Sequence, residues 1–374
     1  MISFNKPYLC GNELRYIQDA VSSMKISGNG KYTRRCQEFF EETYRFKKCL
    51  LTTSCTDALE MAAILCEITL GDEVIVPSYT FVSTVNAFVL RGAKIVFVDS
   101  NQGHPGMDED QLASLITPKT KVIVAVHYAG VACDMDKIMA LAAKYGLFVV
   151  EDAAQAIDSY YKGKPLGGIG HLAAFSFHET KNIISGEGGM LVVNDERFIS
   201  RSEIIWEKGT NRSAFFKGEV DKYGWVDIGS SFLPSEIIAA FLWAQVECLG
   251  TIQRRRSEIW QNYYRGLDPL QKSLKLKLPI IPDYASNNAH LFYILLSDFE
   301  VRDRLIQFLK LRNMHAVFHY LSLHKSPYYK AKHDGRVLPQ CDYYNDGLLR
   351  LPFYYELGAD DQQAVITAIL SFFE

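Results

Sequence analysis

The chain has 374 residues, of which 48% are hydrophobic and 22% are charged, and its formal net charge at pH 7 is -3. This length accommodates one large and one smaller globular domain, and the composition is that of an ordinary soluble protein. A charge so close to neutral gives no broad attraction to nucleic acid or to anionic membranes, and no apolar stretch approaches membrane-spanning length. We therefore expect neither a nucleic-acid partner nor membrane insertion.

The eight cysteines are scattered along the chain without any CxxC pair. Most lie in apolar stretches, where a free cysteine behaves as a small hydrophobic residue. The first residues lack the basic segment and apolar run of a signal peptide. These features predict no disulfide framework, no metal site and a cytoplasmic location.

Short apolar runs alternate with helical patterns from Lys48 onward, whereas residues 1–35 read as mostly irregular around a helical stretch, Glu13–Met24. One predicted helix begins near Thr56, and two others cover Thr84–Arg91 and Asp134–Tyr145. The predicted strands are Cys49–Thr52, Glu73–Val76, Lys94–Val98, Val122–Val126, Phe148–Val150, Ala173–Phe177 and Met190–Val193. Apolar strands separated by amphipathic helices indicate an α/β fold with a mainly parallel sheet covered on both faces. Ligands bind such sheets beyond the carboxyl ends of the strands.

A long helical region, Pro234–Leu267, follows the last of these strands. Beyond it, the pattern predicts a strand over His290–Leu296 and a helix over Val301–Arg312. We interpret the helical region as a bridge to a smaller α+β domain. The predicted division is a large domain with an N-terminal segment over residues 1–250 and a small domain over residues 251–374.

Polar side chains follow several of the predicted strands. Residues 53–59 (TSCTDAL) join a strand to a helix, and a helix N-terminus suits a phosphate, although ordinary N-capping explains the same residues. Asp152 ends a buried strand and could simply cap the next element. Pyridoxal phosphate (PLP) chemistry, however, needs a carboxylate beside the pyridine nitrogen, and Gln155 could then bond the ring hydroxyl.

Lys181 lies in the turn after another strand, within the segment 174–182 (AFSFHETKN). A lysine there is a candidate for a covalent bond to PLP and for proton transfer, although surface lysines are the usual case. The glycines of residues 185–189 (SGEGG) permit close approach of the backbone to a ligand. This loop lacks the GxGxxG pattern, so a dinucleotide site is disfavoured.

Taken together, these motifs resemble the DegT/DnrJ/EryC1/StrS family of sugar aminotransferases over essentially the whole chain. They are SCTDAL, PSYTFVST, EDAAQ, FSFHETKN, GEGG and HYLSLH. The resemblance implies the aspartate-aminotransferase fold (PLP fold type I), PLP as cofactor, and a homodimer with shared active sites. It also implies a role for each residue that matches a family motif.

Lys181 matches the catalytic lysine that bonds to PLP, and Asp152 and Gln155 match the contacts of its ring nitrogen and ring hydroxyl. Phe81 stands where an aromatic ring stacks on the cofactor, although core packing is an alternative. The expected phosphate contacts are Cys55, Thr56, Ser176 and, from the neighbouring subunit, Ser231. At this last position many family members have an asparagine.

Within the family, FHETKN, EKGTNRSAFF and DIGSSFL are most similar to the branch that makes dTDP-4-amino-4,6-dideoxygalactose for surface polysaccharides such as lipopolysaccharide O-antigen. This implies L-glutamate as donor and dTDP-4-keto-6-deoxy-D-glucose as acceptor. A related branch makes the gluco epimer, and the sequence leaves the C4 configuration open. The candidate substrate contacts are Lys208, Asn211, Arg212, His319, Tyr320 and His324. Structural histidines and a solvated loop are the alternatives for these residues.

Two other functions are compatible with the same fold. PLP-dependent sugar dehydrases of the family carry histidine in place of the lysine, so Lys181 favours transamination. A non-catalytic sugar-nucleotide-binding regulator would not need this lysine at all. Both remain alternatives at this point.

Overall fold

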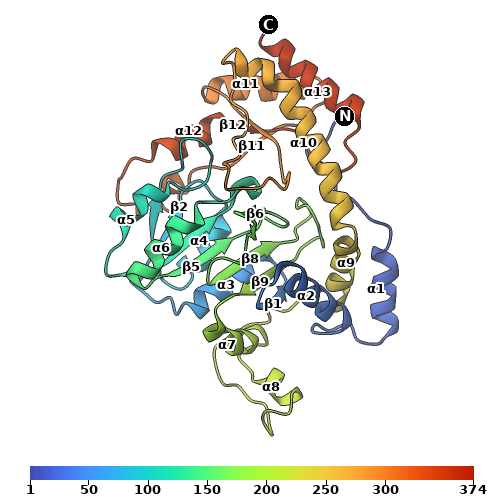
Figure 1. The fold of residues 1–374 in the computed structure, drawn as a ribbon, viewed down its shortest axis with the longest axis vertical. Coiled ribbons are helices and arrows are strands. Elements are labelled where there is room, and N and C mark those ends of the chain that lie inside the picture. The colour runs from blue at the N-terminus through green and yellow to red at the C-terminus, as the bar shows by residue number, and fades with distance from the viewer.

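The computed structural model describes residues 1–374 and is built around a seven-stranded sheet with the order β1-β9-β8-β5-β4-β2-β3 (Figure 1). Its strands are β1 (Lys48–Thr52), β2 (Glu73–Pro77), β3 (Lys94–Val98), β4 (Thr120–Val126), β5 (Phe148–Asp152), β8 (Leu172–Ser176) and β9 (Gly189–Val193). Only β9 runs antiparallel to its neighbours, β1 and β8. The predicted α/β fold with a mainly parallel sheet is confirmed.

Both faces of this sheet are buried. Along each strand, successive residues belong alternately to two hydrophobic clusters, one on each face. In β2, Val74 and Val76 join one cluster of 40 buried residues, and Ile75 joins another of 39, so the two faces are covered almost equally. The first cluster includes residues of α3 (Cys55–Leu65), α4 (Val82–Val89) and α7 (Glu196–Trp206). The second includes residues of α1 (Glu13–Ser22), α2 (Lys31–Tyr44), α6 (Met135–Tyr145) and α9 (Glu236–Glu247).

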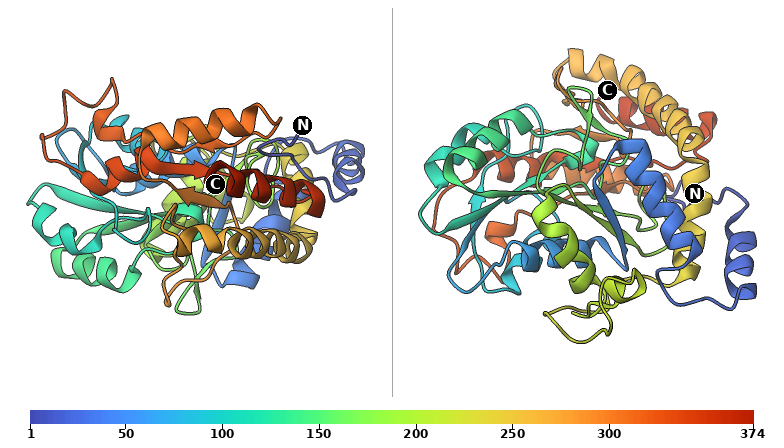
Figure 2. Two further views of the ribbon diagram at one scale, coloured as in Figure 1. Left: turned by 90° about the horizontal axis from the view of Figure 1, so that it is seen from above. Right: turned by 60° about the horizontal axis from the view of Figure 1, so that its bottom comes forward.

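The C-terminal part of the chain forms its own core of 25 buried residues. Its helices are α10 (Leu249–Lys272), α11 (Phe299–Lys310), α12 (Pro339–Gly347) and α13 (Ala359–Phe372), and its sheet has the order β10-β12-β11, with β10 (Tyr293–Leu295), β11 (Val317–Phe318) and β12 (Leu348–Arg350). Figures 1 and 2 show α10 and α13 side by side at the end of the molecule opposite α7. The division of the chain at residue 250 stays a prediction.

The remaining short elements are α5 (Leu112–Leu115), α8 (Arg212–Phe216), β6 (Tyr160–Tyr161), β7 (Lys164–Pro165) and the 3-10 turns Glu109–Gln111, Tyr128–Gly130 and Leu323–Lys325. Residues 207–231, which we call the arm, include α8 and project from the body of the protein (Figures 1 and 2). The arm exposes large apolar side chains, with Phe216 at 70% and Trp225 at 81% of their full exposure. No helix combines the length and the apolar character needed to cross a membrane.

The N-terminal segment agrees with the prediction except at its end, where the structure has a second helix that was not predicted. Helix α2 begins at Lys31, within that range. The carboxylate of the buried Glu236 accepts hydrogen bonds from the backbone amides of Gly30, Tyr32 and Thr33. These amides have no partner within their own helix, so a residue two hundred positions away stabilises the helix start. Local sequence gives no sign of this contact.

Candidate active site

A cavity of about 600 Å³ opens at the carboxyl ends of the strands of the large sheet. The residues that line it follow different strands: Ser54 and Thr56 follow β1, Thr80 and Phe81 follow β2, and His127 follows β4. Asp152 and Ser176 are the last residues of β5 and β8. The C-terminal part of the chain adds His290, His319, Tyr320 and Arg350. The cavity therefore lies where the topology of a parallel sheet predicts a ligand site.

Lys181 lines this cavity from the turn that follows β8. Its backbone N–H donates to the carbonyl of His178, which closes the turn at 2.9 Å. Burial is the main cause that lowers the pKa of the Lys181 amine from 10.5 to about 8. At that pKa, about a tenth of the amine is neutral at pH 7, against well under a thousandth for an ordinary lysine. Lys181 is therefore suited to act as a nucleophile and as a proton carrier.

The Asp152 carboxylate is buried and held in place by two hydrogen bonds. Thr84 donates its hydroxyl to Oδ2 at 2.6 Å, and the backbone N–H of Ala154 donates to Oδ1 at 3.1 Å. Thr84 is itself fixed by a 2.9 Å contact with the Thr80 hydroxyl. This network orients a carboxylate beside the cavity while leaving it without any cationic partner from the sheet.

The N-terminus of α3 forms another side of the cavity. Ser54 caps the helix by accepting a hydrogen bond from the Asp57 amide at 3.1 Å, and Cys55 and Thr56 follow as its first residues. The Thr56 hydroxyl donates to Ser83 at 2.9 Å. The first amides of a helix and several hydroxyls in one place are suited to bind a phosphate. Phe81 also lines the cavity, and this residue is 53% exposed rather than packed in the core.

Gln155 links the two parts of the molecule at this cavity. Its carbonyl oxygen accepts from the backbone N–H of Ala129 at 2.6 Å, and its amide nitrogen donates to the Tyr320 hydroxyl at 3.1 Å. The neighbouring His319 bonds through Nδ1 with the Tyr128 hydroxyl at 3.0 Å. Burial, followed by the nearby charges of Arg350 and Lys181, holds the pKa of His319 well below its usual value, so its ring is neutral at pH 7.

The arm residues lie away from this cavity within the chain. Lys208, Arg212 and Ser231 line a separate cavity of about 770 Å³ beside the loop Ser27–Gly30. Asn211 lines neither cavity and accepts a hydrogen bond from the Gly224 amide at 2.7 Å. Within one chain, the structure therefore separates these four residues from Lys181.

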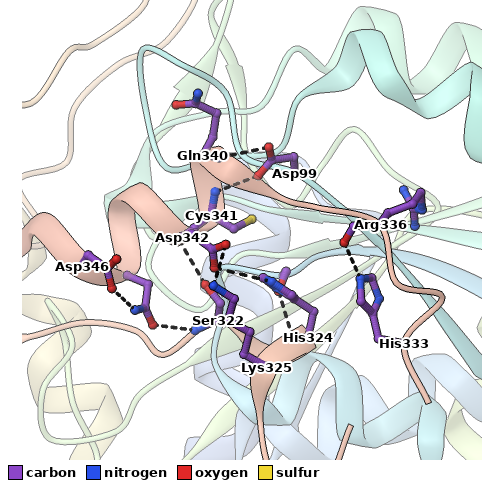
Figure 3. A network of polar contacts seen from close by, with 12 residues as sticks. Asp99, Ser322, His324, Lys325, His333, Arg336, Gln340, Cys341, Asp342 and Asp346 are labelled. Carbon is purple, nitrogen blue, oxygen red and sulfur yellow. Dashed lines mark hydrogen bonds and ion pairs between the residues drawn. The ribbon is translucent and has the colours of Figure 1, made fainter. Parts of the chain in front are cut away.

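His324 also lies outside the cavity lining, in the polar network drawn in Figure 3. Its Nδ1 contacts the Ser78 hydroxyl at 2.7 Å, and its Nε2 lies 3.5 Å from the Asp342 carboxylate. Asp342 also pairs with Lys325 at 2.7 Å. These contacts tie the segment after β11 to α12, as expected for a structural histidine.

Several cavity residues were not selected from the sequence. Thr84 and His290 have no distinctive sequence signal, because Thr84 lies within an ordinary helix pattern and His290 within a predicted strand. Arg350 does have a signal that could have identified it, since it interrupts the apolar run Leu348–Leu351. An arginine at such a position is rarely buried without a partner or a ligand.

The chain matches known proteins along its whole length. The model of the DegT/DnrJ/EryC1/StrS aminotransferase family matches residues 7–370. The Uncharacterized protein MJ1066 of Methanocaldococcus jannaschii is 30% identical in an alignment of 372 residues that covers 97% of this chain and 95% of that protein.

Solved structures have the same fold over nearly the full length of this chain. The aminotransferase TlmJ from Streptoalloteichus hindustanus is 27% identical with a TM-score of 0.90, over 99% of this chain and 98% of TlmJ. Spr1654 from Streptococcus pneumoniae, described as a sugar aminotransferase, is 25% identical in its PMP form with a TM-score of 0.90, over 99% of this chain and 98% of that one. Spr1654 has also been solved in a PLP form.

Proposed function

The chain belongs to the DegT/DnrJ/EryC1/StrS aminotransferase family, and from this premise we propose that it aminates a specific nucleotide sugar. The enzyme is a PLP-dependent aminotransferase with PLP fold type I. The proposed reaction transfers the amino group of L-glutamate to C4 of dTDP-4-keto-6-deoxy-D-glucose. Its product is a dTDP-4-amino-4,6-dideoxyhexose, of galacto or gluco configuration, for surface polysaccharide synthesis such as that of lipopolysaccharide O-antigen.

The observation that carries the proposal is the presence of Lys181, with its lowered amine pKa, and the buried Asp152 in one cavity. The residues fit PLP: the hydroxyls and amides around Cys55, Thr56 and Ser176 suit its phosphate, and Asp152 suits its ring nitrogen. The exposed face of Phe81 suits stacking on its ring. Bound PLP supplies an electron-accepting ring that stabilises negative charge on the carbon that loses a proton.

The roles of the protein groups follow from their surroundings. The Lys181 amine can remove a proton from one carbon and return it to another, because its pKa of about 8 lies near working pH. The hydrogen bonds from Thr84 and the Ala154 amide fix the orientation of the Asp152 carboxylate, which would hold a proton on the ring nitrogen of bound PLP. Gln155, bonded to Tyr320, orients the Tyr320 hydroxyl toward the cavity from the C-terminal part of the chain.

The sugar specificity rests on the similarity of FHETKN, EKGTNRSAFF and DIGSSFL to the branch that acts on dTDP-4-keto-6-deoxy-D-glucose. Two of these three segments lie in or beside the arm. We include Lys208, Asn211, Arg212, His319, Tyr320 and His324 as candidate substrate contacts in the proposal. His319 and Tyr320 are supported by their place in the cavity lining.

A homodimer is also part of the proposal. The arm exposes Phe216, Trp225 and other apolar side chains, which is typical of a surface that packs against another protein. Packing of the arm on a second subunit would bring Ser231 toward the phosphate site of that subunit, as the family resemblance implies. The eight free cysteines support the proposed cytoplasmic location, since such thiols persist in a reducing compartment.

The test is to incubate the PLP-loaded protein with L-glutamate and dTDP-4-keto-6-deoxy-D-glucose and to record the proton NMR spectrum of the sugar. We expect an amino sugar, with a small H3–H4 coupling for the galacto epimer and a large one for the gluco epimer. A keto sugar that returns unchanged, while L-glutamate still bleaches the yellow cofactor band, refutes the proposed acceptor. Lys181→Ala protein should bind PLP weakly and fail to form the amino sugar.

A further inference from the structure

The hydrogen bonds of His290 fix which of its two ring nitrogens carries a proton. Its Nδ1 lies 2.8 Å from Oδ1 of Asn182. The amide nitrogen of Asn182 donates to the backbone carbonyl of Asn288 at 2.9 Å and to Oε1 of Gln253 at 2.7 Å. Because a carbonyl oxygen only accepts, the Asn182 amide has a single orientation, and its Oδ1 accepts from His290. The proton of the His290 ring is therefore on Nδ1.

The other ring nitrogen of His290, Nε2, is a hydrogen-bond acceptor without a partner in the chain. Burial, followed by the positive charges of Lys181 and Arg256, holds the pKa of His290 well below its usual value, so the ring is neutral at pH 7. A neutral imidazole with its proton on Nδ1 has a lone pair on Nε2. No group of the protein donates to this Nε2, yet it is not fully enclosed by protein atoms. It therefore opens on the active-site cavity, which His290 lines.

Two observations associate the Lys181 amine with this acceptor. Lys181 directly precedes Asn182, whose side chain holds the His290 ring, and both Lys181 and His290 line the cavity. Of the cations whose charge acts on the His290 ring, Lys181 has the largest effect on its pKa. The amine itself shares no hydrogen bond with any side chain. An unpaired donor and an unpaired acceptor in one buried site are both stabilised by a hydrogen bond between them.

We propose that His290 positions the Lys181 amine for proton transfer, an inference that rests on the role of Lys181 in the proposed function. When the amine is not bonded to the cofactor, it donates one N–H to Nε2 of His290. The amine ends a flexible four-carbon stem, so this hydrogen bond restricts the direction of its lone pair. His290 takes no proton from the substrate and acts only through Lys181, which makes it a positioning residue.

The two ring nitrogens can be tested separately, because each has a close substitute. In His290→Asn, the side-chain amide takes the place of Nδ1 and still donates to Asn182, but no atom reaches the position of Nε2. In His290→Gln, the longer side chain brings an amide oxygen to the position of Nε2 and loses the donor to Asn182. A role limited to holding Asn182 predicts that His290→Asn behaves as wild type. A role toward Lys181 predicts instead that His290→Gln does.

The first measurement is the pKa of the Lys181 amine in the cofactor-free chain. Acetic anhydride modifies only the neutral form of an amine, so the pH dependence of acetylation at Lys181, followed by mass spectrometry, gives this pKa. Wild type should give a value of about 8. A hydrogen bond to Nε2 stabilises the protonated amine, so His290→Asn should lower this pKa by about 1 and His290→Gln should restore it. The other titratable groups that act on the amine, Asp152, Cys55 and Arg350, are the same in all three proteins.

The second measurement is the rate of each half-reaction in single turnovers of the PLP-loaded enzyme. Lys181 moves a proton in both, so His290→Asn should slow both about tenfold with little change in apparent KM, and His290→Gln should recover part of the loss. L-Glutamate deuterated at Cα should give a larger isotope effect in His290→Asn than in wild type, because proton transfer becomes more rate-limiting. The matched control, His104→Asn, changes a buried histidine that does not line the cavity and should leave the Lys181 pKa and both rates unchanged.

Two results would overturn the inference: an unchanged Lys181 pKa in His290→Asn, or a loss confined to the sugar half-reaction, which would make a sugar hydroxyl the partner of Nε2. Melting temperatures check that each variant folds. If His290→Asn does not, His290→Gln tests the inference alone, because a Lys181 pKa well below that of wild type would contradict it. The proposed function fails in a different way, when wild-type enzyme leaves the keto sugar unchanged. The acetylation experiment then still tests His290, since it uses no substrate.

Discussion

Replacing Lys181 by methionine should stabilise the cofactor-free protein. In the folded state, burial lowers the pKa of Lys181 from 10.5 to about 8, so keeping this amine protonated at pH 7 costs folding free energy. Each pKa unit corresponds to about 1.4 kcal/mol, which gives a cost of about 3 kcal/mol for the full difference. Methionine has a similar length and no charge. For a chain of this size, with an unfolding entropy of about 0.8 kcal/mol/K, the gain corresponds to a melting temperature about 4 °C higher.

The pH dependence of the stability difference between wild type and Lys181→Met provides a sharper test. Between pH 8 and pH 10.5 the unfolded chain keeps the Lys181 proton and the folded chain has lost it, so wild-type stability rises with pH in this window relative to Lys181→Met. We expect the advantage of Lys181→Met to be largest below pH 8 and to vanish near pH 10.5. Thermal unfolding of both cofactor-free proteins across this range measures the difference.

The control for this prediction is Lys275→Met, at an exposed lysine without an ion pair, which should change the melting temperature little at any pH. The reasoning is refuted if Lys181→Met is less stable than wild type at pH 7. It is also refuted if the gain stays constant up to pH 10.5, because the gain would then come from packing rather than from charge.

Three further predictions concern the surroundings of the site. Thr84→Val removes the hydrogen bond to Asp152 and should weaken PLP binding about tenfold in an absorbance titration. Thr84→Ser keeps the hydroxyl and should bind PLP as wild type does. Equal affinity of wild type and both variants would contradict the role of Thr84. Glu151→Gln breaks a buried pair with His127, 2.9 Å apart, and should lower the free energy of urea unfolding by about 3 kcal/mol at pH 7. Since the folded-state pKa of Glu151 is lowered, that difference should be present above pH 4.5 and shrink as the pH falls below it; a difference independent of pH would contradict this account. Trp225→Ser should shift a dimer toward monomer in sedimentation velocity, and an unchanged distribution would exclude Trp225 from the interface.

The large sheet could be predicted from the sequence because its strands carry a local signal. Each is a short run of apolar residues bounded by turns, as expected for strands that are buried on both faces. Helix α2 and strand β12 were not predicted, for different reasons. The start of α2 depends on the distant Glu236 carboxylate, and β12 is only three residues long with an arginine at its end.

The same distinction, between local sequence signals and contacts with distant residues, applies to the active site. Asp152 and Lys181 could be selected because each follows a predicted strand, and the topology of a parallel sheet brings such positions to one edge. Thr84 acts through Asp152 from a separate helix, and a helical pattern does not specify which hydroxyl reaches a carboxylate. Ser231 and the arm lie apart from Lys181 in one chain, so any contribution from them depends on a second subunit, which a single sequence does not display.

Lys181 connects stability with function. It is a basic group whose burial lowers its pKa, and no carboxylate of the chain forms an ion pair with it. A protein that only had to fold would replace it with an apolar residue, because its surroundings give the charge no such partner. Its presence in the cavity is explained if the compensation comes with the cofactor, to which its amine would bond covalently. On this account Lys181→Met should stabilise the cofactor-free chain and abolish transamination, so the residue that lowers stability is the one that activity requires.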